Sequence, residues 1–491
     1  MKLGFLIKSL PDCRVLSESD DFEVTSITCD SRKASCGTLF VAVKGLRDDG
    51  HEFIQEAIKK GAQAIVVEKM RFPHADIQSG PNKIAVISVR DTRLALADLA
   101  AEFYGRPSQK VKVAGITGTN GKTTTTYLIE SILKEGGYSP AVLGTVNYRF
   151  KEKIFPSSNT TPGPLELQSL LAQIVKEKID YAIIEVSSHA LDQNRTQGID
   201  FHSAIFTNLS QDHLDYHRTL EDYFQAKAAL FRNLKPGAFA VINEDDACSK
   251  KLKAETAARV VTYAIEKQAD IFARDIDFGL SRSEFLLVTR DEKDIVNTGL
   301  IGRHNLYNVL AAVAWAKEAG ITFDKIKSGI EKFYSVPGRL EKIETQRGFS
   351  VFVDYAHTED ALKNVISALR QISLKKIIVV FGCGGERDKT KRPKMGRVVS
   401  DLADFAVITS DNPRSEEPGK IIEEIKTGIN KDNYCVIADR REAIEKALSL
   451  AGPEDIVLVA GKGHETYQVL KDGVIDFDDR EVIKSCLKSM S

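Results

Sequence analysis

The segment Thr117–Thr123, which reads Thr-Gly-Thr-Asn-Gly-Lys-Thr, combines residue types that bind nucleotide phosphates. Its glycines let backbone N–H groups turn inward around phosphate oxygens, and the start of the following helix adds a partial positive charge. Lys122 would reach the β- and γ-phosphates, and the Thr123 hydroxyl would bind Mg²⁺. Ile116 stands where the general G-x-x-x-x-G-K-[ST] pattern has glycine. The segment therefore predicts a nucleotide phosphate site without indicating which NTPase it belongs to.

Acidic and imidazole side chains follow two further apolar runs. Glu185 ends one run, where a carboxylate beside the phosphate loop would be well placed for Mg²⁺. The segment Asp212–His217 holds two carboxylates and two imidazoles, which could suggest zinc. The chain has no H-E-x-x-H, and no cysteine accompanies the segment, so zinc is disfavoured. The alternative for Asp212–His217 is an ordinary surface loop, and Lys227, on the helical stretch Asp222–Leu230, looks by itself like an ordinary surface lysine.

Three polar loops near the C-terminus each follow an apolar, strand-like run. The first, Gly382–Lys389, is glycine-rich and then basic, so it could clamp a carboxylate. The others are Asp411–Arg414 and Gly461–Glu465. Each loop alone could be a plain turn. Open α/β sheets bind ligands at the carboxyl ends of their strands, so the three loops together predict a second binding site.

The elements that must position these residues alternate between strands and helices, which predicts an α/β fold with parallel sheets. A first block contains the strands Thr38–Val43 and Ala64–Val67 and the helices Glu52–Lys60 and Thr92–Tyr104. A breaker cluster, Gly105–Ser108, ends it.

The second block opens with the strand Val111–Thr117 and the helix Thr123–Glu135, which should stop at Gly136-Gly137. Its further strands are Tyr181–Val186, Ala204–Asn208 and Phe239–Asn243. The third block begins near Val336-Pro337-Gly338. Its expected elements are the helix Asp360–Gln371 and the strands Val351–Tyr355, Lys376–Phe381, Phe405–Thr409, Tyr434–Ala438 and Asp455–Ala460. We therefore predict domains at residues 1–108, 109–336 and 337–491.

Composition limits the possible partners. The 491 residues include 68 Lys+Arg and 69 Asp+Glu, a balance that argues against a general nucleic-acid or anionic-membrane surface. The most apolar runs have strand length, too short to span a bilayer. The seven cysteines form no C-x-x-C pair, which fits reduced thiols in the cytoplasm.

At this point the chain closely resembles the Mur ligases of peptidoglycan precursor synthesis. The resemblance rests on motifs spread over essentially the whole sequence: Cys29–Arg32, Thr117–Thr124, Asn159–Thr161, Glu185–His189, Asp212–His217, Gly302–Asn305, Pro337–Arg339, Asp354–His357, Asp411–Arg414 and Gly461–Glu465. It implies three domains: an N-terminal UDP-binding α/β domain, a central P-loop ATPase with a mostly parallel sheet, and a C-terminal Rossmann-like domain that binds an amino acid.

The resemblance also implies a role for each matching residue. Cys29 and Ser31 would contact the uridine nucleotide. The pyrophosphate, sugar and peptide of that substrate would be held by Asn159, Thr160, Thr161, Ser187, Gln193 and Arg195. ATP would be bound by Gly118, Thr119, Asn120, Gly121, Lys122, Thr123, Thr124, Asn305, Arg339 and Asp354. Magnesium would be bound by Thr123, Glu185, His213 and Lys227, with Lys227 carbamylated in this family. Lys122, Lys227 and His213 would serve catalysis.

The sequence Asp411-Asn412-Pro413-Arg414 is the form associated with meso-2,6-diaminopimelate. This amino acid differs from lysine by a distal carboxylate, which an arginine fork can bind through two hydrogen bonds. The other pocket positions are Arg387, Gly461 and Glu465, and Glu465 could take the distal ammonium. One region, Gly45–Asp48, departs from relatives that have a Gly-His-Gln-type turn there, although backbone contacts to uridine would survive that change.

The expected activity is therefore ATP-dependent addition of meso-2,6-diaminopimelate to UDP-N-acetylmuramoyl-L-alanyl-D-glutamate through an acyl phosphate. We expect a cytoplasmic monomer that binds these small molecules, Mg²⁺ and ATP, and neither nucleic acid nor membrane. Three alternatives stay open. They are the same reaction with L-lysine, which Arg414 disfavours, a folate polyglutamate ligase, which the N-terminal block disfavours, and a nucleotide-dependent switch without synthesis.

Overall fold

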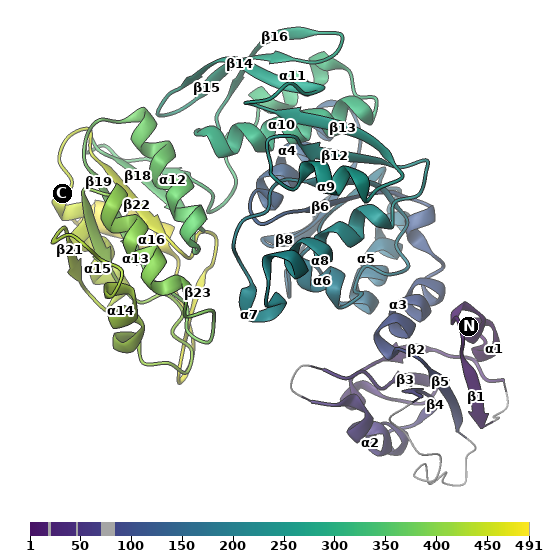
Figure 1. Cartoon of the computed structure of the whole chain (residues 1–491). Helices are drawn as coiled ribbons and strands as arrows, with labels where there is room; N and C mark the ends of the chain where they lie inside the picture. Colours follow the sequence, from purple (N-terminus) through teal and green to yellow (C-terminus); the bar gives the residue numbers. More distant parts are fainter. Residues whose placement is uncertain (18–20, 46–47, 70–83, 491) are drawn as a thin grey trace. The chain divides into compact units, whose positions relative to one another are not determined.

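The computed structural model describes residues 1–17, 21–45, 48–69 and 84–490 (Figure 1). Its Cα positions divide into two compact units. Unit 1 comprises residues 1–115, 139–203 and 233–238, and unit 2 comprises residues 116–138, 204–232 and 239–491. The first predicted block lies in unit 1 and the third in unit 2, while the central block contributes to both. None of the helices in the described ranges is long and apolar enough to cross a membrane.

The N-terminal sheet has the order β1-β5-β4-β3-β2, with β1 antiparallel and the other pairs parallel. Its strands are β1 Arg14–Ser17, β2 Ser26–Thr28, β3 Thr38–Val41, β4 Ala62–Glu68 and β5 Ala85–Val89. The helices are α1 Leu3–Leu6, α2 Ile54–Lys59 and α3 Thr92–Phe103, and a 3₁₀ turn, Gly50–Phe53, supplies the start of the helix predicted at residue 52. Alternate side chains of the strands enter two apolar cores, one on each face.

An 11-stranded sheet has the order β16-β15-β14-β13-β12-β11-β6-β10-β7-β8-β9. The strands are β6 Lys112–Thr117, β7 Pro140–Leu143, β8 Asn147–Phe150, β9 Lys153–Pro156, β10 Tyr181–Glu185, β11 Phe201–Phe206, β12 Phe239–Asn243, β13 Arg259–Ala264, β14 Ile271–Phe278, β15 Ser283–Val288 and β16 Lys293–Thr298. The pairs β10–β7, β12–β13 and β13–β14 are parallel, which agrees with the parallel sheet expected for this block, although β7, β13 and β14 were not among the predicted strands. The pairs β7–β8, β8–β9, β14–β15 and β15–β16 are antiparallel, and these edge strands escaped the sequence pattern.

Eight helices of the described chain accompany this sheet. They are α4 Lys122–Glu135, α5 Pro164–Lys176, α6 Ser188–Asp192, α7 Leu214–His217, α8 Leu220–Arg232, α9 Ser249–Ala254, α10 Arg303–Glu318 and α11 Phe323–Glu331. Helix α4 ends where the glycine pair predicted. Gly137 has a φ of 80°, and the Tyr138 N–H donates to the Leu133 carbonyl at 2.9 Å, which satisfies an end carbonyl of the helix.

The C-terminal sheet has the order β17-β18-β22-β19-β20-β21, and all its pairs except β17–β18 are parallel. Its strands are β17 Glu341–Ile343, β18 Ser350–Asp354, β19 Ile377–Phe381, β20 Phe405–Ile408, β21 Tyr434–Val436 and β22 Ile456–Ala460, and a separate hairpin pairs β23 Tyr467–Leu470 with β24 Gly473–Asp476. Helices α12 Glu359–Ile372, α13 Lys391–Leu402 and α14 Pro418–Lys426 pack on one face, and α15 Arg440–Leu450 and α16 Asp479–Ser489 on the other (Figure 1).

The carboxyl ends of β22, β19 and β20 are neighbours in this sheet. They lead into the three polar loops that begin at Gly382, Thr409 and Gly461. The sequence prediction that these loops meet at one edge is therefore confirmed.

Candidate active site

The phosphate loop connects β6 to α4 and is held by the segment that follows β11. The Thr119 N–H donates to the Asn208 carbonyl, and the Asn120 N–H donates to Asn208 Oδ1, both at 2.9 Å. The Thr207 hydroxyl donates to the Asn120 carbonyl at 2.6 Å. Lys122 is the first residue of α4, and its Nζ donates to the carbonyls of Gly118 at 2.8 Å and Thr119 at 2.9 Å. The lysine thus spans the loop in which a polyphosphate would lie.

Two glycines of the loop sit where no other residue fits. Gly118 has a φ of 148°, and a Cβ there would collide with the Thr207 hydroxyl. Gly121 has a φ of 88°, and a Cβ there would collide with Asn308 Oδ1. Left-handed backbone and close approach both demand glycine. The two glycines therefore fix the turn of the loop, while Ile116 stands where the general phosphate-loop pattern has a glycine.

A buried lysine lies close to the phosphate loop in unit 2. Lys227 of α8 is only 2 % exposed, and its Nζ lies 4.2 Å from the centroid of the Tyr223 ring. Burial, and then the positive charge of Lys122, hold the pKa of Lys227 well below its ordinary value, whereas Asp212 acts in the opposite direction. The sequence reading of Lys227 as an ordinary surface lysine is therefore wrong.

His213 and Asp212 complete this cluster. The His213 Nε2 lies 3.4 Å from Asp212 Oδ2, and the imidazole packs edge-on to Tyr223 with ring centroids 6.1 Å apart. Burial opposes ionisation of Asp212, yet the neighbouring His213, His357 and Lys391 lower its pKa overall. Tyr223 was missed in the sequence. Its signal was its position one helical turn before Lys227, on the same face of α8.

The expected magnesium ligands divide between the two units. Thr123, His213 and Lys227 lie in unit 2, and Glu185 lies in unit 1. Within the described residues, no group of three or more His, Cys, Asp and Glu side chains is arranged to hold a metal ion. Mg²⁺ prefers oxygen ligands, which the hydroxyl of Thr123 and the carboxylate of Asp212 offer. The donor chemistry of unit 2 therefore fits Mg²⁺ bound together with nucleotide phosphates, and the imidazole of His213 is the weaker match.

The remaining residues expected to bind ATP lie in unit 2 as well. The Arg339 guanidinium stacks 4.6 Å from the centroid of the Tyr355 ring, and its Nη2 donates to the Thr123 hydroxyl at 3.4 Å. Its Nε is buried, and among the described residues it has no hydrogen-bond partner. A buried guanidinium N–H left open beside the phosphate loop fits an anionic phosphate.

Asn305 and Asp354 are occupied by protein groups. Asn305 Nδ2 donates to the Ile301 carbonyl at 3.0 Å, and Asn305 Oδ1 accepts from Asn308 Nδ2. The Oδ1 of Asn308 is the atom that a Cβ at Gly121 would meet. The two oxygens of Asp354 accept the N–H groups of Leu340 at 2.6 Å and Ala356 at 2.7 Å. Burial raises the pKa of Asp354. Asn305 thus orients Asn308 beside the phosphate loop, and Asp354 fixes the backbone at Leu340 and Ala356.

Unit 1 gathers the residues expected to bind the nucleotide-linked peptide. Glu185 is buried at the end of β10, and its two oxygens accept from the N–H and hydroxyl of Thr145 at 3.0 and 2.9 Å. The Thr145 hydroxyl lies 3.1 Å from that of Thr160. The Thr161 hydroxyl donates to the Glu185 carbonyl at 2.8 Å and accepts from the Ser187 N–H at 3.0 Å. Thr145 was missed in the sequence.

Arg195 extends the same cluster. Its Nη1 donates to the Thr161 carbonyl at 3.1 Å, and its Nε and Nη2 both donate to Gln193 Oε1. The backbone of Asn159 is fixed through its carbonyl, which accepts from the Tyr148 hydroxyl. The structure thus brings together all six residues expected to hold the pyrophosphate, sugar and peptide.

The residues expected to contact uridine lie at the carboxyl end of β2. Ser31 starts a short 3₁₀ turn, and its hydroxyl donates to Glu56 Oε2 at 2.8 Å. Cys29 is exposed. Leu46 and Arg47, in the segment that departs from relatives, lie outside the described residues.

The expected amino-acid pocket lies at the edge where β22, β19 and β20 end. Arg414 has a φ of 54°, and its Nη1 donates to the carbonyls of Gly385 at 2.7 Å and Asn412 at 3.3 Å. Within the described chain, its Nε and Nη2 donate to no protein group, so one edge of the guanidinium stays available for a carboxylate. Pro413 is buried, and Arg387 is exposed with its Nη1 on the Glu386 carbonyl.

Asn412 joins the two sides of this pocket. Its Nδ2 donates to Glu465 Oε2 at 2.9 Å, and its N–H donates to Asp411 Oδ1 at 2.6 Å. Gly461 has a φ of 117°, and a Cβ there would press on Asp411 Oδ2. The pocket therefore presents the cation of Arg414 and the anion of Glu465 on either side of one asparagine.

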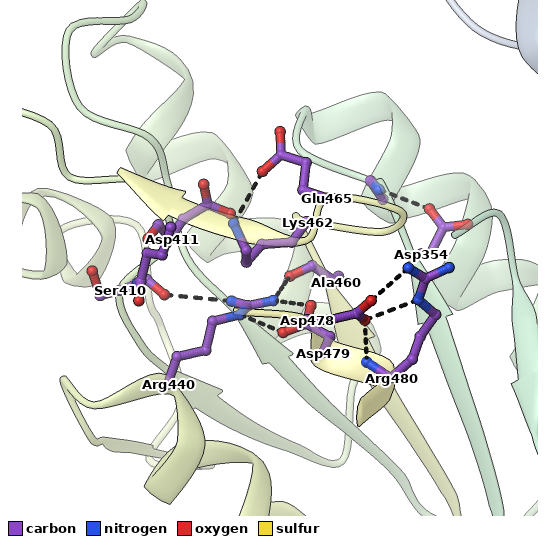
Figure 2. Close-up of polar contacts among 12 residues, drawn as sticks. Asp354, Ser410, Asp411, Arg440, Ala460, Lys462, Glu465, Asp478, Asp479 and Arg480 are labelled. Atoms are coloured by element: carbon purple, nitrogen blue, oxygen red, sulfur yellow. Dashed lines mark hydrogen bonds and ion pairs between the residues drawn. The ribbon is translucent and has the colours of Figure 1, made fainter. Parts of the chain in front are cut away.

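Two fully buried charges beneath the pocket were missed in the sequence (Figure 2). The Arg440 guanidinium at the start of α15 forms two hydrogen bonds with Asp479 at the start of α16, at 2.8 and 2.7 Å, and both side chains are 0 % exposed. Arg440 also donates to the carbonyls of Ala460 at 3.0 Å and Ser410 at 3.4 Å. Because these carbonyls begin two of the pocket loops, the ion pair ties both loops to the helices below. Nothing in the local sequence marked either residue.

Three protein-family models match the chain. The Mur ligase family, catalytic domain, matches residues 23–104. The Mur ligase middle domain matches residues 116–316, and the Mur ligase, glutamate ligase domain, matches residues 338–463. The order of the three matches follows the three predicted blocks.

Similar proteins span the whole length. A UDP-N-acetylmuramoyl-L-alanyl-D-glutamate–2,6-diaminopimelate ligase of Clostridium botulinum is 43% identical over 494 residues, covering 100% of both chains. A solved structure of a ligase with the same name is 32% identical, covers 97% of this chain and 99% of its own, and has a TM-score of 0.67. The MurF ligase of Thermotoga maritima in complex with ADP shares the fold at 22% identity, covering 95% of this chain and 99% of its own, with a TM-score of 0.64.

Proposed function

The chain belongs to the Mur ligase family, and from this premise we propose that it joins 2,6-diaminopimelate to UDP-N-acetylmuramoyl-L-alanyl-D-glutamate. The reaction is an ATP-dependent amide-bond formation. One observation carries the choice of amino acid. Arg414 and Glu465 both bond to Asn412, so a cation and an anion stand together where the distal carboxylate and ammonium of diaminopimelate would bind.

In the first step, a carboxylate oxygen of the D-glutamyl side chain attacks the γ-phosphorus of ATP. An acyl phosphate forms, and ADP leaves. Two anions must approach each other, so their charge has to be neutralised. We propose that Lys122 at the phosphate loop and Arg339, whose buried Nε has no hydrogen-bond partner among the described residues, supply this positive charge.

Magnesium, when bound, would supply positive charge that neutralises the phosphates. Thr123, His213 and Lys227 of unit 2 are the residues that we propose hold it; Glu185, which the family resemblance also implies, belongs to unit 1. The lowered pKa of Lys227 supports carbamylation, because an uncharged amine is the form that adds CO₂, and the product would offer oxygens where an ammonium would repel the metal.

In the second step, the uncharged amine of diaminopimelate attacks the carbonyl carbon of the acyl phosphate. The tetrahedral intermediate collapses, phosphate leaves, and the nitrogen loses a proton. Arg414 and Glu465 would orient the distal end of the amino acid so that the reacting amine is aimed. If the substrates are held by separate domains, the domains must close on one another, and we propose the breaks at Gly105–Ser108 and Val336–Gly338 as the hinges.

The UDP-dipeptide would be held by Ser31 and Cys29 at its uridine end. Its pyrophosphate, sugar and peptide would be held by the cluster around Thr161 and Arg195. The hydroxyls and the guanidinium of that cluster match phosphate and hydroxyl partners. We further propose a cytoplasmic monomer. The balanced charge of the chain, with a formal net value of −1, supports the proposal that it binds neither nucleic acid nor an anionic membrane surface.

Phosphate release with one amino acid at a time tests the proposal. The purified chain is given ATP, Mg²⁺ and the UDP-dipeptide, and then meso-diaminopimelate, its LL and DD isomers, L-lysine or L-glutamate. We expect release that depends on the UDP-dipeptide and is fastest with meso-diaminopimelate, together with a product mass equal to dipeptide plus diaminopimelate minus water.

Other results would point to the alternatives. Fastest release with L-lysine would mean that Arg414 does not select the amino acid. Turnover with a folate and glutamate, and none with the UDP-dipeptide, would indicate a folate polyglutamate ligase. ATP hydrolysis that is indifferent to every amino acid would indicate a nucleotide-dependent switch.

A further inference from the structure

Lys462 is a fully buried lysine in the loop that follows β22, and no role was expected for it. Its side chain is 0 % exposed, whereas that of Glu465, its partner, is 15 % exposed. The Lys462 Nζ donates to Glu465 Oε2 at 3.0 Å and to Asn412 Oδ1 at 3.2 Å. A buried ammonium is costly unless it is paired, so the cost in solvation must be offset by these two hydrogen bonds and by the Tyr467 ring, whose centroid lies 5.6 Å from the Nζ.

Those contacts fix the amide of Asn412. Its Oδ1 accepts from both Lys462 Nζ and the N–H of Val469, the latter at 3.0 Å. Two donors on one side mean that this side must be the oxygen, which leaves Nδ2 to face Glu465. Lys462 therefore acts on Glu465 twice, directly and through Asn412.

Glu465 is in turn held by one oxygen. Both hydrogen bonds end on Oε2, from Asn412 at 2.9 Å and from Lys462 at 3.0 Å. No donor among the described residues reaches Oε1. In Figure 2 one oxygen of Glu465 meets Lys462 while the other points away from the network. The carboxylate is thus pinned on one side and open on the other.

Ordinary ion pairs of the same spacing look different. Lys484 pairs with Glu481 at 2.8 Å, also three residues apart, with both side chains more than half exposed. Such pairs contribute little and leave the carboxylate free to turn. The Lys462–Glu465 pair differs because its lysine is sealed from water and shared with Asn412.

We propose that Lys462 is a positioning residue for amino-acid selection, which holds Glu465 so that Oε1 meets the distal ammonium of the amino acid. The inference rests on the proposed function and deepens it. Arg414, by contrast, is oriented by the backbone carbonyls of Gly385 and Asn412. Loss of Lys462 should therefore disturb recognition of the distal ammonium and spare recognition of the distal carboxylate.

Two analogues separate these ends. 2-Aminopimelate keeps the distal carboxylate and lacks the distal amine, and L-lysine keeps the amine and lacks the carboxylate. The experiment compares kcat/KM for diaminopimelate, 2-aminopimelate and L-lysine in the wild type and in Lys462→Met, whose side chain has similar length and no charge. We expect the preference for diaminopimelate over 2-aminopimelate to fall at least about tenfold, and the preference over lysine to change less than about threefold.

Further variants isolate the role of the lysine. Glu465→Gln should lose the same preference, and the double variant Lys462→Met/Glu465→Gln should lose little more than either single one, since both act through one carboxylate. Lys462→Gln keeps a hydrogen-bond donor and should lie between Met and wild type. Lys484→Met, at the exposed pair, should match wild type in every ratio.

Three results would overturn the proposal. In the first, Lys462→Met lowers kcat/KM for all three amino acids equally. In the second, the preference over 2-aminopimelate is unchanged. In the third, Lys462→Met and Lys462→Gln both fail to fold by circular dichroism, which would assign the lysine to domain stability. A wild type that uses none of the three amino acids would instead refute the proposed function, so the two failures are distinguishable.

Discussion

The phosphate loop and the amino-acid pocket are built by opposite means. The loop is contiguous in sequence, and its shape depends on two glycines and on backbone hydrogen bonds to Thr207 and Asn208. The pocket draws on three loops separated by dozens of residues and rests on side chains that are charged and buried. A site of the first kind is encoded locally, whereas one of the second kind depends on the whole domain folding around it.

The charged residues of the two sites should differ in how much they matter for the stability of the fold. Lys122 is a partly buried residue whose Nζ reaches carbonyls of its own loop, so we expect its replacement to affect activity more than stability. Arg440 and Asp479 are 0 % exposed, so each needs the other for its charge to be tolerated. Mutations in the phosphate loop should therefore lower activity without lowering stability. Mutations of the buried charges at the pocket should lower both.

The largest effect is expected from Arg440→Met, which leaves the Asp479 carboxylate buried without its cation. We expect the free energy of unfolding to fall by about 3–5 kcal/mol, measured by urea denaturation. The double variant Arg440→Met/Asp479→Leu should recover most of this loss, because neither charge remains. Arg397→Met, which breaks an exposed pair with Asp401, should change the free energy of unfolding by less than about 1 kcal/mol. An unfolding midpoint for Arg440→Met equal to that of wild type would contradict the contrast between the regions.

The second largest effect is expected from a change at Lys122, which should alter activity and leave stability unchanged. Lys122→Ala removes the cation that we propose neutralises the phosphates, and we expect kcat for phosphate release to fall about 10²–10³-fold. Its unfolding midpoint in urea should stay near that of wild type. Lys134→Ala, on the same helix and 62% exposed in its pair with Glu130, should keep normal turnover. Near-normal turnover of Lys122→Ala would remove the lysine from its assigned role.

What the sequence could predict follows the same division. The phosphate loop, the strand ends and the meeting of three polar loops at one sheet edge were all predictable, because each is a local pattern of glycines, apolar runs and polar ends. Arg440, Asp479 and Lys462 were not, because a buried charge has the same local signature as a surface charge. Lys227 was misread for that reason, since only the packing of α8 against the phosphate-loop region shows that it is sealed from water. The antiparallel strands β15 and β16 were missed because neither is a continuous buried run: β15 alternates buried and half-buried residues, and the first half of β16 is exposed.

A smaller effect is expected at the mouth of the pocket. Arg414→Ala removes the guanidinium edge left open for a distal carboxylate, and the preference for diaminopimelate over L-lysine in kcat/KM should fall about 10–100-fold. Arg387→Ala, an exposed arginine of the same pocket, should lower that preference less. Both variants should unfold at the wild-type urea midpoint, because neither arginine is fully buried. An unchanged preference in Arg414→Ala would mean that another group reads the carboxylate.

The smallest expected effect is on the pH dependence of stability, and it involves Glu416, which is close to Arg414 in the sequence. Glu416 bonds through both oxygens to Arg392, which is 0 % exposed, and this hydrogen bonding lowers the pKa of Glu416 from 4.5 to about 2. A depressed folded-state pKa gives stability that is present above the unfolded value of 4.5 and is lost as pH falls toward 2. In urea titrations between pH 5 and pH 3, wild type should therefore lose on the order of 1 kcal/mol more than Glu416→Gln, whose amide does not titrate. If the unfolding free energies of the two proteins changed in parallel with pH, the charge of Glu416 would contribute nothing to stability. The stabilising buried ion pairs near the pocket would then be limited to those of Arg440 and Lys462.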